Sequence, residues 1–123
     1  VRENGLEERV TFLGDVDESE LVGELARCRA VCFPAHQEDY GLVTVEAFAS
    51  AKAVITCDDS GGPTELVRDG VNGFVTAPNP LSLATTLAML SEQPDLAERL
   101  GQQALRGVSE ITWEDTIKQL LLV

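Results

Sequence analysis

Two glutamates and a glycine within residues 30–47 (AVCFPAHQEDYGLVTVEA) have the types and the spacing of a binding site. Glu38 and Glu46 have seven residues between them, and Gly41 lies inside that interval. An ionised carboxylate only accepts hydrogen bonds, so both side chains suit the hydroxyls of a sugar or a ribose. Phosphate needs donors instead, and backbone N–H groups at the start of a helix provide them. Here these would be the amides of Gly41, Leu42 and Val43.

A strand, a loop and a helix must position these residues. Residues 30–33 form a short apolar run that ends at a proline, which predicts a buried strand of a parallel sheet. Over residues 42–51 the larger apolar side chains recur at helical spacing, which predicts a helix. In such a unit the loop lies at the carboxyl end of the strand, where ligands of parallel sheets bind.

The rest of the chain alternates between the same two kinds of element. Short apolar runs predict further strands at residues 10–13, 53–56 and 74–76. Capping residues or prolines predict helix starts at Asp17, Pro63, Asn79, Pro94 and Thr112. Strands that alternate with helices indicate a parallel sheet with right-handed crossovers. The predicted fold class is α/β, a Rossmann-like parallel sheet of about four strands flanked by helices.

Composition fits one domain with one ordinary core. The chain has 123 residues, of which 44% are hydrophobic, and a formal net charge of −12. Such a surface repels nucleic acid and anionic membranes, and its charge favours solubility. No apolar run is long enough to span a membrane and no signal peptide is visible, so we expect a cytoplasmic location.

Three cysteines and one histidine lack the spacing of a metal site. Cys28, Cys32 and Cys57 each lie in or beside an apolar segment, so we expect reduced side chains that pack as small hydrophobic residues. A zinc site would need a fourth ligand, and His36 is the only histidine. We interpret His36 as an exposed loop residue and assign it no catalytic role. These residues therefore predict no zinc site, and we expect no cofactor.

Together these segments resemble the C-terminal, donor-binding domain of the family 4 glycosyltransferases, retaining enzymes of GT-B fold with a Glu-x7-Glu signature. Residues 61–78 (GGPTELVRDGVNGFVTAP) are similar to the family's Gly-Gly-x-x-Glu segment. Residues 10–14 and 112–114 resemble the preceding strand and the start of the closing helix. The likeness covers nearly the whole chain and implies a UDP- or GDP-linked hexose as donor.

The resemblance also implies roles for the residues of the signature. Glu46 would accept hydrogen bonds from the ribose 2′- and 3′-hydroxyls of the nucleotide. Glu38 would be the catalytic residue and hold hydroxyls of the donor sugar near the reacting carbon. The backbone amides of Gly41, Leu42 and Val43 would face the sugar and the diphosphate, and no metal is implied.

Some positions stay open or depart from the family pattern. The pair Gly61 and Gly62, with Glu65, fits either a binding role or turn geometry with an acid near a helix start. Ala35 and Tyr40 are mild departures. Ala51 stands where a left-handed glycine often ends the helix, so we expect this helix end to differ from the family's or to be strained.

The family's C-terminal domain has six strands, and the four predicted here match its third to sixth. No segment supplies the other two, the basic pair that neutralises the donor diphosphate, or the N-terminal domain that holds the acceptor. We therefore expect residues 1–123 to be a single partial domain without transfer activity of its own. The strand at residues 10–13 then either pairs with residues 30–33 or leaves an edge that another chain covers, as in a homo-oligomer.

Two functions from other classes stay open. A non-hydrolysing sugar-nucleotide epimerase shares the overall fold, but its Thr-Glu-Arg-Pro-Glu signature is absent, because residues 61–65 read GGPTE. The other alternative is a non-catalytic Rossmann-like folding or interaction module. Specific binding of a nucleotide would separate this module from a donor-binding domain.

Overall fold

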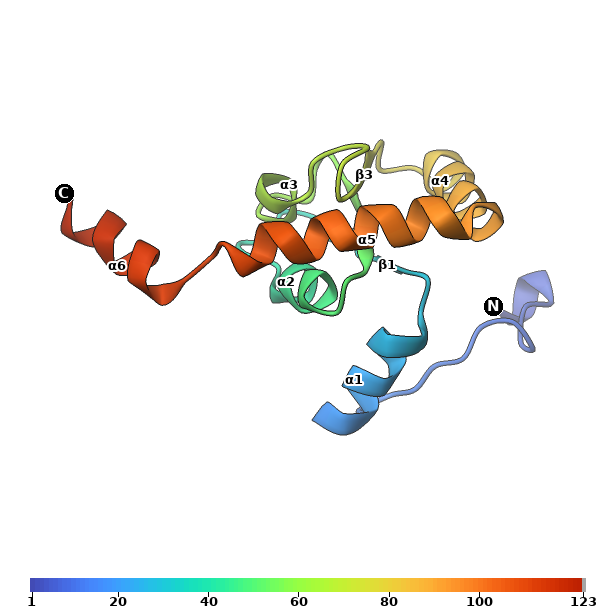
Figure 1. Cartoon of the computed structure of the whole chain (residues 1–123). Coiled ribbons are helices and arrows are strands. Elements are labelled where there is room, and N and C mark those ends of the chain that lie inside the picture. The colour runs from blue at the N-terminus through green and yellow to red at the C-terminus, as the bar shows by residue number, and fades with distance from the viewer. Residues whose placement is uncertain (123) are drawn as a thin grey trace.

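A parallel sheet of three strands lies at the centre of the molecule (Figure 1). The computed structural model describes residues 1–122. In the order β1-β2-β3, the strands are β1 (Ala30–Cys32), β2 (Ala53–Cys57) and β3 (Gly73–Thr76). The middle strand, β2, is buried at all five of its residues. It pairs in parallel on both sides, with Ala53 opposite Ala30 and Val54 opposite Gly73.

Helices connect the strands in the expected alternation. They are α2 (Leu42–Ala49) after β1, α3 (Pro63–Leu66) after β2, and α4 (Pro80–Glu92) and α5 (Pro94–Ser109) after β3. The long helix α5 packs against α2, α4, β2 and β3. The predicted fold class is confirmed as α/β with a parallel sheet, although the sheet has three strands and not four.

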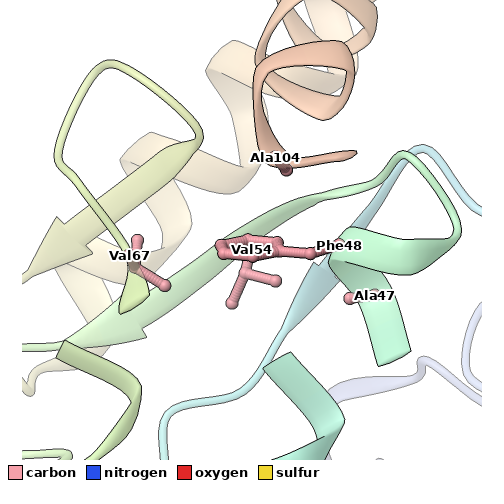
Figure 2. Close-up of a cluster of buried hydrophobic side chains, with 5 residues drawn as sticks. All are labelled: Ala47, Phe48, Val54, Val67 and Ala104. Atoms are coloured by element: carbon pink, nitrogen blue, oxygen red, sulfur yellow. The ribbon is translucent and has the colours of Figure 1, made fainter. Parts of the chain in front are cut away.

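Two hydrophobic clusters hold the helices on the sheet. The first contains Ala47, Phe48, Val54, Val67 and Ala104 (Figure 2). The second contains Ala53, Ile55, Leu90, Ala97 and Leu100. Successive residues of β2 belong to different clusters because successive side chains of a strand point to opposite faces. Full burial of a side chain such as Ile55 contributes roughly 1.5–3 kcal/mol to stability.

The helix starts follow the capping residues. Before α1 (Glu18–Arg27), the Asp17 carboxylate accepts a hydrogen bond from the Glu20 N–H at 2.9 Å, and the Glu20 carboxylate accepts from the Asp17 N–H at 3.1 Å. Asn79 caps α4 by accepting from the N–H of Ser82 at 2.9 Å. Thr112 caps α6 (Trp113–Leu121) in the same way. These starts were predictable because a cap needs only residues within one turn.

The prediction of a strand at residues 10–13 is wrong. This segment is irregular, the Phe12 side chain is 81% exposed, and β1 pairs only with β2. A strand needs a neighbour that takes up its N–H and C=O groups, and none is present here among residues 1–122. Figure 1 shows the N-terminal segment, with its short helix η1 (Arg2–Asn4), standing away from the sheet together with α1. Of the two alternatives for this segment, the pairing with residues 30–33 does not form.

The three cysteines were expected to be reduced and to pack as small hydrophobic residues. All three cysteines are free thiols, and Cys57 is buried as expected. Cys32, on the edge strand β1, is exposed, which corrects the expectation that it packs in the core. At Cys28, desolvation raises the pKa of the thiol more than the nearby Lys52 lowers it.

Within residues 1–122, no helix has the length and apolar character needed to cross a membrane.

Candidate functional site

All five predicted site residues line one hollow at the carboxyl end of β1. Its volume is about 360 Å³. The lining consists of the predicted Glu38, Gly41, Leu42, Val43 and Glu46 together with Phe33, Asp39 and Tyr40. Leu42 and Glu46 are four residues apart on α2 and so lie on one face of the helix. The helix thereby brings the second glutamate next to the loop that carries the first.

Gly41 turns the chain from this loop into α2. Its φ of 74° and ψ of 62° are left-handed, and a Cβ at this position would lie 2.7 Å from Cγ of Pro63. Both features favour glycine. No side chain caps the helix start, and its first turn contains no acidic residue. The N–H groups of Leu42 and Val43 have no intrahelical acceptor, so they are available to an anionic ligand.

Both predicted glutamates of the hollow are available to a ligand. Glu38 is half-buried and Glu46 is exposed. The ion pairs found among residues 1–122 include neither of them. No lysine or arginine of the described chain lines the hollow. Hydroxyl groups are therefore the natural partners of the carboxylates, and any anion here would depend on backbone amides.

Two loops meet beside the hollow, the β1 loop (residues 33–41) and the β2 loop (residues 58–62). The N–H of Glu38 donates to the carbonyl oxygen of Ser60 at 2.8 Å, and the N–H of Gly62 donates to the carbonyl oxygen of Glu38 at 2.7 Å. A Cβ at Gly62 would lie only 2.4 Å from the Asp39 carbonyl oxygen. Gly61 has a left-handed φ of 76°. These contacts favour the loop-geometry interpretation of the two glycines.

Two further residues that the sequence raised lie outside this hollow. His36 is exposed, and its Nδ1 lies 3.0 Å from Oδ2 of Asp59. Glu65 borders a separate cavity of about 100 Å³ whose lining includes Arg68 and Asn72. In the described part of the chain, no three His, Cys, Asp or Glu side chains come together as a group that could hold a metal.

The sequence prediction missed part of the lining and its support. Asp39 and Tyr40 lie between the predicted Glu38 and Gly41 in the sequence, so inspection of the whole loop could have found them. Ser60 is different. It reaches the β1 loop only because two loops far apart in the sequence meet at one edge of the sheet, and no local pattern signals that contact.

Comparison with known proteins gives consistent sequence matches. The family model described as glycosyl transferases group 1 matches residues 1–106. The D-inositol 3-phosphate glycosyltransferase of Nocardia farcinica is 34% identical over 120 residues, which are 97% of this chain and 26% of that protein. The glycogen synthase of Mycobacterium tuberculosis is 33% identical over 105 residues, 84% of this chain and 25% of that protein. The chain thus spans about a quarter of the length of these relatives.

Solved structures give the same picture. Sucrose-phosphate synthase from Thermosynechococcus elongatus superposes with a TM-score of 0.87 at 28% identity, over 98% of this chain and 31% of that one. HepE from Anabaena, crystallised with UDP-glucose, superposes with a TM-score of 0.82 at 31% identity, over 98% of this chain and 33% of that one.

Proposed function

Because the chain belongs to the glycosyl transferases group 1, we propose that its hollow binds the nucleotide-sugar donor of a retaining family 4 enzyme. The reaction would transfer a hexose from a UDP- or GDP-sugar to an acceptor. One observation carries this proposal: Glu38, Glu46 and the free amides at the start of α2 line the same hollow at the carboxyl end of a parallel strand. The similarity to HepE, which was crystallised with UDP-glucose, supports a UDP-linked donor.

Each of the five predicted residues of the hollow has a role in this proposal. Glu46 accepts from the ribose hydroxyls, a charge-assisted contact of roughly 1.5–3 kcal/mol. Glu38, in the loop, holds hydroxyls of the donor sugar near the reacting carbon and is the proposed catalytic residue. The amides of Gly41, Leu42 and Val43 bind the sugar and the diphosphate, where negative charge grows as the leaving group departs.

The isolated chain is proposed to bind the donor without transferring the sugar. Its hollow is open to solvent, and no cationic side chain of residues 1–122 lines it to neutralise the diphosphate. Acceptor binding is assigned to a separate N-terminal domain, which makes that domain a partner of this one. A cytoplasmic location stays a prediction.

An NMR titration tests the proposal. The full chain is titrated with UDP, GDP, ADP and their glucose or mannose conjugates. We expect one nucleotide series to shift the amide resonances of residues 41–43, while no free sugar or transfer product accumulates. Glu46→Ala should weaken binding by about tenfold or more, since one charge-assisted contact is lost. Glu98→Ala, an exposed glutamate on α5, is the matched control and should bind as the parent chain does.

Two outcomes would contradict the proposal. If no nucleotide binds to the folded chain, a folding or interaction module describes it better. If Glu46→Ala and Glu98→Ala bind equally well, the hollow is not the nucleotide site.

A further inference from the structure

A buried hydroxyl connects the end of β2 to the loop that carries Glu38. Ser60 is 0% exposed. Its Oγ donates to the carbonyl oxygen of Ala35 at 2.6 Å and accepts from the N–H of Cys57 at 3.1 Å. The Thr56 hydroxyl contacts the same loop only at its first residue, Phe33. Asp59 also reaches this loop, at the exposed His36, so Ser60 is the buried side chain of the β2 loop that contacts the interior of the β1 loop.

Backbone hydrogen bonds to Ser60 and Gly62 fix Glu38 itself. The carbonyl oxygen of Ser60 accepts from the Glu38 N–H at 2.8 Å, and the Glu38 carbonyl oxygen accepts from Gly62 at 2.7 Å. The preceding residue, Gln37, donates to the Asp59 carbonyl oxygen at 3.0 Å. Both backbone polar groups of Glu38 are thus held by the β2 loop, while its carboxylate stays on the lining of the hollow.

Gln37 shows that the β1 loop depends on these bonds. Its φ of 50° is in the left-handed region, which is unfavourable for a residue with a Cβ. Such a conformation persists only where surrounding contacts hold it. If the Ser60 hydroxyl is removed, the loop can relax and move Glu38 away from its place in the hollow.

We propose that Ser60 is a positioning residue for the donor sugar, acting through the backbone of Glu38. This inference rests on the proposed function of the hollow. Glu46 and the amides at the start of α2 lie on a helix whose start is set by Gly41 and not by Ser60. Loss of the Ser60 hydroxyl should therefore weaken recognition of the sugar and leave recognition of the nucleotide nearly unchanged.

The test compares Ser60→Ala with Thr86→Val in the full chain. Thr86 is also buried and hydrogen-bonded through its hydroxyl, but it lies on α4 outside the lining of the hollow. Affinities for UDP and UDP-glucose are measured for each variant. We expect the ratio of the two affinities to shift about tenfold against UDP-glucose in Ser60→Ala, the factor for one lost hydrogen bond, with UDP binding changed less than about twofold. Thr86→Val should leave both affinities unchanged.

The positioning role would be overturned if Ser60→Ala lost affinity for UDP and UDP-glucose by the same factor. It would also be overturned if both affinities stayed unchanged. Amide hydrogen exchange provides a second readout that needs no ligand. We expect the Glu38 and Gly62 amides to exchange about tenfold faster in Ser60→Ala and at the parent rate in Thr86→Val. Unchanged exchange overturns the inference. If the parent chain binds neither ligand, the proposed function fails, and exchange still shows whether Ser60 holds Glu38.

Discussion

Gly62 shows how closely single residues set the distance between the two loops at the site. A Cβ there would lie 2.4 Å from the Asp39 carbonyl oxygen and 2.8 Å from its carbonyl carbon. Because both atoms belong to backbone, Gly62→Ala must push the loops apart. We expect a loss of about 1–3 kcal/mol in the free energy of unfolding, measured by urea denaturation.

Gly23→Ala is the control for this substitution. Gly23 lies in α1 with open space around it, so alanine there should leave stability unchanged or raise it by up to about 1 kcal/mol. A Gly62→Ala variant as stable as the parent chain would show that the two loops are not packed as described.

Among single residues, the sequence was enough to predict those that one strand–loop–helix unit brings together. Glu38, Gly41 and Glu46 are close in the chain, so a strand–loop–helix unit was enough to bring them to one hollow. Ser60 and the close approach at Gly62 depend on where another strand ends, and a linear pattern carries no such information. The choice of loop geometry for Gly61 and Gly62 needed the distances from these glycines to the backbone of the β1 loop.

Among the elements, α2 has the strained end that the sequence indicated. The helix ends at Ala49, and Ala51 has a left-handed φ of 56°. This conformation costs an L-residue roughly 1–2 kcal/mol, which glycine avoids. Since glycine also loses more entropy on folding, we expect Ala51→Gly to stabilise the chain by about 0.5–1 kcal/mol, measured by thermal denaturation.

The matched control for Ala51→Gly is Ala84→Gly. Ala84 is exposed in the interior of α4, where glycine should destabilise by about 1 kcal/mol. If both substitutions lower the melting temperature, the left-handed geometry at Ala51 is not a source of strain.

Elements were predictable to the extent that they are self-contained. The caps at Asp17, Asn79 and Thr112 define helix starts with residues of one turn, and the structure has all three. The segment at residues 10–13 has an apolar sequence typical of a strand but no strand beside it. Strand formation is a property of a pair, so its failure could not be seen in the segment alone.

For the whole molecule, the packed part and the exposed parts divide clearly. The two clusters join the sheet to α2, α4 and α5. Helices α1 and α6, which stand away from the sheet in Figure 1, contribute no buried residue. Large apolar side chains are consequently exposed outside the packed part, including Phe12 at 81% and Trp113 at 83%. The net charge of −12 opposes association of these surfaces, and salt should weaken that opposition.

The free edge of β1 leads to the prediction for the assembled state. Because the segment at residues 10–13 does not pair with β1, the expectation that another chain covers this edge stays a prediction, and we commit it to a second copy. Sedimentation equilibrium under reducing conditions should show self-association that increases with protein and salt concentration.

Cys32→Lys places a charge on the exposed edge strand and should keep the chain monomeric. Leu81→Lys adds the same charge at an exposed position of α4 and should associate like the parent chain. A parent chain that stays monomeric at every concentration and salt would contradict the homo-oligomer, and equal association of both variants would place the contact elsewhere.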